Sequence, residues 1–299
     1  MRLASLFVVW SVVCAQLVSA EPTPAPAPGL QDINPAAQPA TIPAASGHYV
    51  SVHGLKMYYE IHGQGEPLLL LHGGLCSIPV WPEAIAYFSR HYRVIAPEQM
   101  GHGRTADDPG RPMDYHAMAE DTIELLRQLN VTEVFIIGWS DGGIVGLDLA
   151  INHPGLVKKL AVSGANYSHS APAAPADPAK PVADNIPSFI REPYERLSPD
   201  GAAHWPVLLE RVRKMWETQP NFTPGQLGAI VAPTLVIAGD HDFSTPEYTT
   251  QMWRLIPKAQ LWIAPNSTHG LPKRRAALFN EVVDAFFQEP AVSPAAPGK

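Results

Sequence analysis

The sequence predicts an α/β protein with a mostly parallel central sheet flanked by helices. Short apolar runs alternate with segments of helical periodicity along most of the chain, which is the pattern of strand–helix–strand units. The run at residues 134–139 is apolar apart from one glycine, as expected of a strand buried on both faces. A chain of 299 residues, 46% of them hydrophobic, is long enough for one large domain with an inserted subdomain.

The apolar run ends in the pattern Gly-x-Ser-x-Gly, formed by Gly138, Ser140 and Gly142. Glycine has no Cβ, so the chain can turn sharply there and pack a helix closely behind the strand. Such a turn holds its serine in a strained conformation with the hydroxyl exposed above the sheet, and the amide of Asp141 faces the same space. The pattern predicts a nucleophile elbow; the alternative is an ordinary strand–turn–helix with a solvated serine.

The other expected elements follow in chain order. Residues 48–53 and 57–62 form two short strands around Gly54, which predicts an antiparallel hairpin at the sheet edge. Further strands are expected at residues 67–71, 92–96, 157–162, 233–239 and 259–264. Helices are expected at residues 81–91, 115–129, from the serine turn to about 153, at 186–196, 202–218 and 247–255, and finally up to about 287.

From about Gly47 to Phe287 the chain resembles the α/β-hydrolase superfamily. Many members carry a helical cap over the active site, inserted between two strands. Here the alternation of strands and helices breaks at residues 166–226, and a structureless loop of that length is uncommon inside a compact domain. The expected organisation is therefore a hydrolase core at residues 47–165 and 227–288, with the cap at residues 166–226.

A serine hydroxyl is a poor nucleophile near neutral pH, so it needs a base, and the base needs an orienting carboxylate. The superfamily places these groups in the order serine, acid, histidine, each in a loop at the carboxyl end of a strand. Ser140, Asp242 and His269 fit this order and these loop positions. Asp240 competes for the acid role, but the family pattern Gly-x-x-Asp selects Asp242 behind Gly239.

The strand at residues 67–71 runs into His72, Gly73 and Gly74. The resemblance implies that the backbone amide of Gly74 is one donor of an oxyanion hole and the amide of Asp141 the other. Two such amides are needed because negative charge appears on the carbonyl oxygen only in the transition state. His72 is expected to be a structural turn residue.

A loop with the sequence Pro-Glu-Gln-Met-Gly-His-Gly begins at residue 97. Family members commonly carry Pro-Asp-x-Arg-Gly-His-Gly at this place, so Glu98 and Met100 depart from the pattern. The loop usually supports the site structurally, and we interpret the two changes as tuning rather than loss of function. It is not a phosphate-binding loop, because no Gly-Lys-Ser/Thr follows.

The reaction that the resemblance implies is hydrolysis of a small-molecule carboxylic ester or lactone through an acyl-enzyme, without cofactor or metal. Consecutive residues such as 240–242 point in different directions and rarely form a metal site alone. The same triad also serves carbon–carbon bond hydrolases, amidases and cofactor-free perhydrolases, and some proteins of this fold bind ligands without catalysis. Candidates to line an acyl or aromatic pocket are Trp139, Tyr167, Trp205, Met215 and Trp216.

The first twenty residues predict a secretory signal peptide. Arg2 supplies a positive charge, residues 3–18 are apolar, and the small residues Ser19 and Ala20 precede a cut. Cleavage after Ala20 would leave a secreted or periplasmic protein without a stable membrane span; an uncleaved anchor is the alternative. Cys76 would then be the only cysteine, and it is expected to be a small packed residue.

The segments at residues 21–46 and 289–299 are rich in proline and alanine, which predicts an extended linker and a disordered tail. The net charge of -7 and the absence of long Lys/Arg runs argue against a nucleic-acid partner. The natural substrate, the acyl and alcohol sizes and the oligomeric state do not follow from the sequence.

Overall fold

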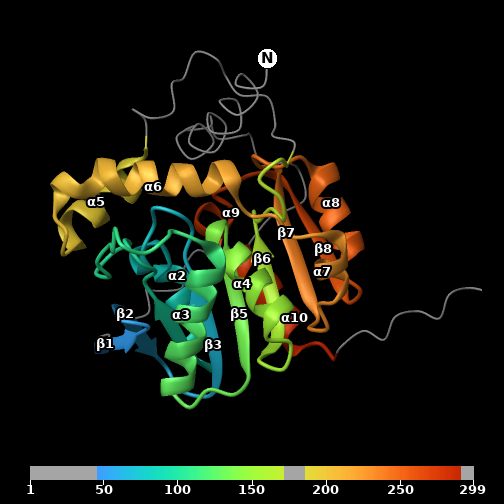
Figure 1. The fold of residues 1–299 in the computed structure, drawn as a ribbon. Helices are drawn as coiled ribbons and strands as arrows, with labels where there is room; N and C mark the ends of the chain where they lie inside the picture. The colour runs from blue at the N-terminus through green and yellow to red at the C-terminus, as the bar shows by residue number, and fades with distance from the viewer. Residues whose placement is uncertain (1–45, 172–185, 291–299) are drawn as a thin grey trace, which may run out of the picture.

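The computed structural model describes residues 46–171 and 186–290, which form a sheet covered by helices (Figure 1). The expected signal peptide, almost all of the expected linker, the tail beyond residue 290 and part of the expected cap lie outside these ranges. The sheet has eight strands in the order β1-β2-β4-β3-β5-β6-β7-β8. This order and the helical layers establish the predicted α/β-hydrolase fold.

The strands occur where the sequence predicts them. Their bounds are β1 (Ser46–Val52), β2 (Leu55–His62), β3 (Glu66–Leu71), β4 (Tyr92–Pro97), β5 (Val134–Trp139), β6 (Val157–Ser163), β7 (Thr234–His241) and β8 (Ala259–Thr268). The predicted edge hairpin is confirmed, since β1 pairs antiparallel with β2 and β2 with β4. All later pairs are parallel. All six residues of β5 are buried, as expected of a strand in the middle of a covered parallel sheet.

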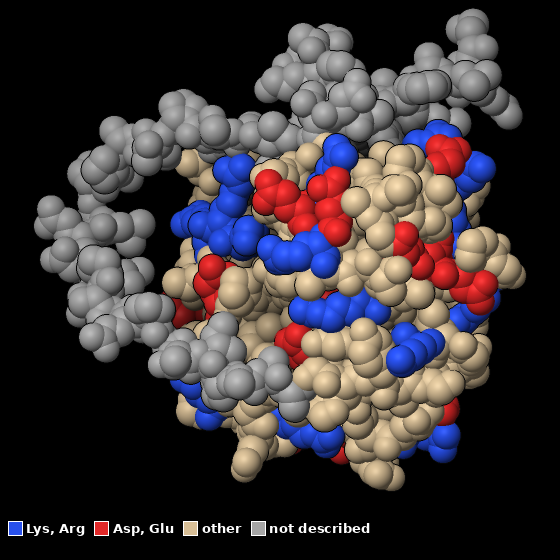
Figure 2. Space-filling view, turned by 90° about the vertical axis from the view of Figure 1, so that its left-hand side faces the viewer, with Lys and Arg blue, Asp and Glu red and all other residues tan. Residues whose placement is uncertain are grey.

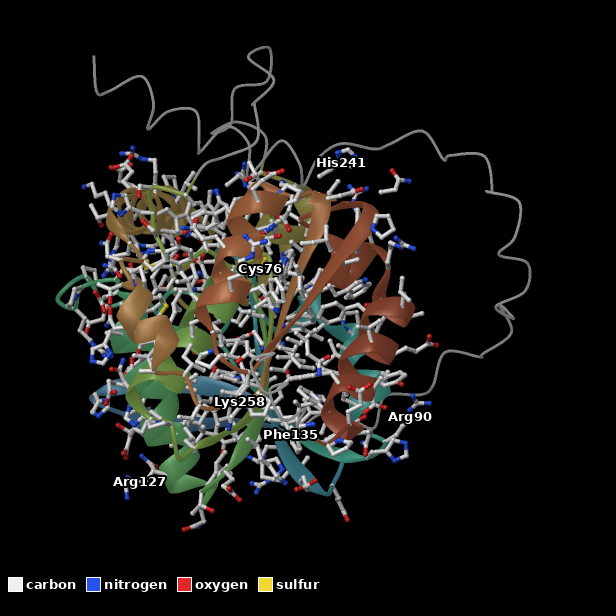
Figure 3. The ribbon with its side chains drawn as sticks, turned by 90° about the vertical axis from the view of Figure 1, so that its right-hand side faces the viewer. Cys76, Arg90, Arg127, Phe135, His241 and Lys258 are labelled. Atoms are coloured by element: carbon white, nitrogen blue, oxygen red, sulfur yellow. The ribbon has the colours of Figure 1, made fainter. Side chains whose placement is uncertain are left out.

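Helices cover both faces of the sheet (Figures 1 and 3). One layer contains α3 (Tyr115–Gln128), α4 (Asp141–Asn152), α7 (Pro224–Gly228) and α8 (Pro246–Leu255), and the other contains α2 (Pro82–Phe88) and α10 (Ala276–Gln288). An aromatic cluster of Phe88, Tyr92, Phe135 and Phe287 packs α2 and α10 onto β4 and β5, with ring centroids 4.9–6.5 Å apart. The sequence did not predict α7 or the short 3-10 helix η1 (Ile78–Val80). Two predicted helices are divided in the structure: the one at residues 202–218 begins with the 3-10 helix η2 (Ala202–His204), and the final one is split into α9 (Leu271–Arg274) and α10.

The parallel strands end at one edge of the sheet, and helices α5 (Ser188–Leu197) and α6 (Trp205–Thr218) lie across that edge (Figure 1). In Figure 3, His241 at the end of β7 lies at this upper edge, whereas Phe135 near the start of β5 lies at the opposite edge. Both cap helices belong to the segment that the sequence marks as an insertion. The loops that follow the strands therefore lie beneath α5 and α6.

Charged groups fasten α6 to the core. The buried carboxylate of Asp107 accepts hydrogen bonds from Arg211 and from His204 Nε2, the latter at 2.9 Å, while the amide of Asp107 donates to Asp200 at 2.7 Å.

On the face shown in Figure 2, Lys and Arg side chains are interspersed with Asp and Glu and form no large basic patch. None of the helices in residues 46–171 and 186–290 is long and apolar enough to cross a membrane.

The turn between β5 and α4 depends on close backbone packing. A Cβ at Gly138 would overlap the carbonyl oxygen of Gly142, and a Cβ at Gly142 would overlap the carbonyl oxygen of Leu71. Backbone atoms cannot move aside as a flexible side chain can. Glycine is therefore required at both positions, as the elbow pattern predicts.

We expect Gly138→Ala to lower the free energy of unfolding by about 3 kcal/mol, because the added methyl group forces the β5–α4 turn apart. The matched control is Gly155→Ala, at an exposed position where an added Cβ meets no atom within 4 Å. The control should unfold within about 0.5 kcal/mol of the unaltered protein. Urea unfolding of the three proteins measures both values, and equal midpoints would contradict the packing argument.

Candidate active site

Ser140 lies at the apex of the turn between β5 and α4, with φ +55° and ψ -121°. A positive φ is uncommon for a residue other than glycine and stores backbone strain of about 1–3 kcal/mol. The Ser140 amide donates to the carbonyl of Ser163 at 2.8 Å, which ties the turn to the end of β6. The turn thus has the backbone conformation of a nucleophile elbow.

Asp242 and His269 meet above the sheet. Asp242 follows β7 directly and His269 follows β8, and the Nδ1–H of His269 donates to Asp242 Oδ1 at 2.8 Å. Each side chain is only 2% exposed. The imidazole packs against the rings of Trp139 and Phe243, with centroids 5.6 and 4.4 Å away, which restricts its rotation. This pair fixes the proton on Nδ1 and leaves Nε2 available to accept another.

Asp240, the rival for the acid position, has a different role in the structure. Its carboxylate accepts hydrogen bonds from the amides of Asn266 and Ser267 at 2.8 and 2.9 Å. These bonds brace the end of β8 just before His269. Asp240 is thus a turn-stabilising residue, and Asp242 is the carboxylate in contact with the imidazole.

Ser140 and His269 line one narrow, mostly apolar pocket together with Gly73, Gly74, Leu75, Cys76, Trp139, Ile186, Ile190 and Trp216. Of the predicted pocket residues, Trp139 and Trp216 belong to this lining. Tyr167 does not: it stacks on Tyr248 with ring centroids 4.7 Å apart. Trp205 packs against Tyr194 inside the cap at 5.1 Å, and Met215 is buried without reaching this pocket. Aromatic identity alone did not distinguish lining residues from packed ones.

Ile186 and Ile190 of the cap segment also line the pocket, although neither was predicted to do so. Both lie in the segment predicted as a helix, where i, i+4 spacing places residues on one face. In the structure α5 begins at Ser188, so Ile190 lies within the helix and Ile186 just before it. That spacing was the available signal. It identifies an apolar face but not the part of the core that the face covers.

The two predicted oxyanion donors lie next to each other. Asp141 is the first residue of α4, so its amide is one of those that a helix leaves without an internal partner. The amide of Gly74 likewise has no backbone partner within the described residues. A Cβ at Gly74 would overlap the Asp141 carboxylate and lie 2.7 Å from Trp216 Cζ2, so a larger residue at this position would displace both side chains.

The side chain of Asp141 is a feature that the sequence analysis missed. Its buried carboxylate accepts hydrogen bonds from the Tyr115 hydroxyl and from Trp216 Nε1, both at 2.9 Å. Burial raises the pKa of Asp141 from 3.8 to about 6, although both hydrogen bonds and the nearby His269 act in the opposite direction. Because Trp216 belongs to α6, this carboxylate connects the cap directly to the elbow.

Cys76 is buried beside the pocket, as predicted for a packed residue (Figure 3). Burial raises the pKa of its thiol to about 12, so the group stays protonated at neutral pH. In the described part of the chain, no cluster of three or more His, Cys, Asp or Glu side chains is arranged to hold a metal ion.

Comparison with known proteins decides the family. The model of the alpha/beta hydrolase family matches residues 68–282, which is more than half of the chain. The chain belongs to the α/β-hydrolase family. Its core strands and the turn at Ser140 lie within the matched residues.

Two relatives show how this α/β-hydrolase compares with characterised members. It is 24% identical over 256 residues to the serine hydrolase BPHL of Mus musculus, covering 82% of this chain and 87% of that protein. It is 28% identical over 254 residues to (E)-2-((N-methylformamido)methylene)succinate hydrolase of Acinetobacter baylyi, covering 77% of this chain and 93% of that protein. Family and relatives together support a hydrolase, and they do not fix the bond that it cleaves.

A solved structure shows the same fold. The meta-cleavage product hydrolase of Pseudomonas fluorescens superimposes with a TM-score of 0.69 at 21% sequence identity, over 81% of this chain and 97% of that one. At this level of identity the similarity establishes the shared architecture only.

We expect Asp141→Asn to stabilise the α/β-hydrolase more at pH 8 than at pH 4. The folded-state pKa of about 6 exceeds the ordinary value of 3.8, so the folded protein keeps a proton that the unfolded chain loses between these pH values. The contribution of Asp141 to the stability of the unaltered protein therefore falls as pH rises through this window, by about 3 kcal/mol at most. Asparagine does not titrate, so the variant lacks this loss.

Urea unfolding at pH 4 and pH 8 measures the effect as the change in the stability difference between Asp141→Asn and the unaltered protein. Glu133→Gln, which removes an exposed carboxylate, is the control for the loss of one charge. A stability difference for Asp141→Asn that is the same at both pH values would show that the buried carboxylate does not titrate in this range.

Proposed function

We propose that this protein is an exported serine hydrolase that cleaves small carboxylic esters or lactones through Ser140, His269 and Asp242. One observation carries the proposal: a buried Asp242–His269 hydrogen bond lies at the same apolar pocket as a serine on a strained strand–helix turn. A nucleophile, a base and an orienting carboxylate are the three groups that acyl transfer to a serine requires.

In the proposed mechanism His269 Nε2 accepts the proton of Ser140 as its oxygen attacks the carbonyl carbon of the substrate. Asp242 holds the proton on Nδ1 and stabilises the imidazolium that forms. The amides of Gly74 and Asp141 donate to the developing oxyanion. The imidazolium then protonates the leaving alcohol, and a water molecule, activated by the same imidazole, releases the acid from Ser140.

The pocket supports an uncharged substrate with an apolar acyl group. None of the described residues that line it carries a basic side chain other than His269, and most of the lining is aliphatic or aromatic. Esters and lactones present an uncharged, electrophilic carbonyl that fits such a lining. Carbon–carbon bond hydrolysis, amide hydrolysis, perhydrolysis and ligand binding without turnover are the alternatives on the same three residues.

Export is the part of the proposal that rests on residues 1–20 alone, which lie outside the described residues. It is tested by the N-terminal sequence of protein recovered outside the cytoplasm of a bacterial host. The expected N-terminus is Glu21; recovery of a chain that retains Met1 in the membrane fraction would indicate an uncleaved anchor instead.

We expect hydrolysis of p-nitrophenyl esters of increasing acyl length, or of members of a lactone panel, to depend on Ser140. Ser140→Ala should lower kcat by about four or more orders of magnitude, because it removes the nucleophile. The control Ser170→Ala changes an exposed serine near the start of the cap segment at residues 166–226 and should retain activity. If the folded protein hydrolyses neither the esters nor the lactones, the proposed activity is excluded. Tight binding of one of these compounds without hydrolysis would favour a non-catalytic role.

A second comparison separates the two candidate acids. We expect Asp242→Asn to lower kcat about 10⁴-fold, because an asparagine no longer enforces the Nδ1–H tautomer of His269. Asp240→Asn should lower it about tenfold or less, since that side chain only braces the loop before His269. A larger loss for Asp240→Asn than for Asp242→Asn would reverse the assignment of the acid.

A further inference from the structure

The loop that carries the amide of Gly74 has little internal support. It lies between the end of β3 and η1, outside any helix or strand, and its one internal backbone bond joins the Cys76 amide to the Gly73 carbonyl at 3.1 Å. Leu75 has φ +61°, a left-handed conformation that is unfavourable for a residue with a side chain. Contacts from outside the loop must therefore hold it in place.

His102 supplies one of these contacts. Its Nε2 accepts a hydrogen bond from the Leu75 amide at 3.0 Å, and its Nδ1–H donates to the Met100 carbonyl at 2.9 Å. The Leu75 amide is thereby occupied, while the adjacent Gly74 amide is left without a backbone partner among the described residues. This bond holds the loop on the C-terminal side of Gly74.

His72 holds the other side of Gly74. Its Nδ1–H donates to the Gly73 carbonyl at 2.8 Å, and its Nε2 accepts from the Gln99 amide at 3.1 Å. The two imidazoles are buried with ring centroids 5.2 Å apart. Burial and the neighbouring His102 lower the pKa of His72 to about 3, and burial also lowers the pKa of His102. Each ring is therefore neutral, and each of its nitrogens already has a partner.

We propose that His102, acting with His72, is a positioning residue that sets the place of the Gly74 amide for the oxyanion. Neither imidazole is among the residues that line the pocket with Ser140, so neither touches the reacting atoms. They clamp the peptide groups on both sides of Gly74 to the loop at residues 97–105. The inference rests on the proposed function, because it assigns the Gly74 amide to an oxyanion hole.

The size of the effect follows from the sensitivity of such donors to position. Removing one oxyanion donor costs about 10²–10³ in kcat, and misplacing a catalytic group by about 1 Å costs about 10². Loss of one clamp should therefore lower kcat about 10- to 100-fold. Substrate binding uses the pocket walls rather than this amide, so KM should change about threefold or less.

Asparagine and glutamine substitutions separate the two ring nitrogens. The amide oxygen of glutamine reaches the position of Nε2, and the amide nitrogen of asparagine takes the position of Nδ1. At His102 the glutamine variant keeps the bond to Leu75 and the asparagine variant loses it. At His72 the glutamine variant keeps the bond to the Gln99 amide and loses the bond to the Gly73 carbonyl, whereas the asparagine variant does the opposite. Either substitution at His72 therefore breaks the connection between Gly73 and the loop at residues 97–105.

The experiment measures the second-order rate at which an alkyl fluorophosphonate labels Ser140, together with kcat and KM for a p-nitrophenyl ester. In labelling, Ser140 Oγ displaces fluoride from phosphorus and its proton passes to His269, while the phosphoryl oxygen occupies the oxyanion hole. We expect both the labelling rate and kcat to fall 10- to 100-fold in His102→Asn and in both His72 variants. His102→Gln, which keeps the bond to Leu75, should stay within about fivefold of the unaltered protein.

Controls distinguish positioning from loss of folding. The same substitutions at the exposed His91 should change neither rate, and thermal unfolding is measured for every variant. A loss of rate in His102→Asn that His102→Gln does not share, at equal thermal stability, does not arise from general destabilisation. The proposal is overturned if His102→Asn and His102→Gln lower the rates equally in step with stability, or if no substitution at either histidine lowers them.

The design also separates this inference from the proposed function. Normal ester turnover with no difference among the variants would overturn the inference alone. Labelling of Ser140 without ester or lactone turnover would overturn the proposed substrate class, and the labelling rates would still decide the inference. Absence of both labelling and turnover in folded protein would overturn the two together.

Discussion

The close approach of two backbone segments at the β5–α4 turn is the constraint on which the rest of the site depends. Carbonyl groups of Gly142 and Leu71 occupy the space that side chains at residues 138 and 142 would need, and the turn leaves Ser140 with a positive φ. Once that turn is fixed, the parallel sheet decides what else reaches it. The parallel strands on the two sides of β5 end at the same edge of the sheet, so the loops after β3, β7 and β8 bring Gly74, Asp242 and His269 to one place.

This dependence explains why so much was predictable from the sequence. Apolar runs gave the strands, and the order serine, acid, histidine after successive strands indicated which polar residues would meet. The ends of the strands were less predictable: β7 and β8 run on to His241 and Thr268 because their pairing continues past a register shift between Gly239 and His241. A local pattern of apolar residues does not contain that shift, which arises between strands.

The pocket wall was the least predictable part, and the reason lies in long-range contacts. The position of the cap over the core is set by Asp107 with Arg211 and by Asp141 with Trp216, pairs separated by 104 and 75 residues. Nothing within either segment specifies its partner. For this reason Tyr167 and Trp205, two of the predicted aromatic pocket residues, are packed elsewhere, while two isoleucines of the cap segment line the pocket.

The two proposed oxyanion amides are held by different physical means, and this explains the departures from the family pattern. The Asp141 amide is fixed by the start of α4, whereas the loop of Gly74 depends on the loop at residues 97–105. Met100 contributes its carbonyl to that support, a group that any residue supplies, while its side chain is buried in the core. Glu98 accepts from the amides of Ile78 and Arg104, so a carboxylate must remain there although its chain length changed. The supporting loop thus preserves hydrogen-bonding groups rather than residue identities.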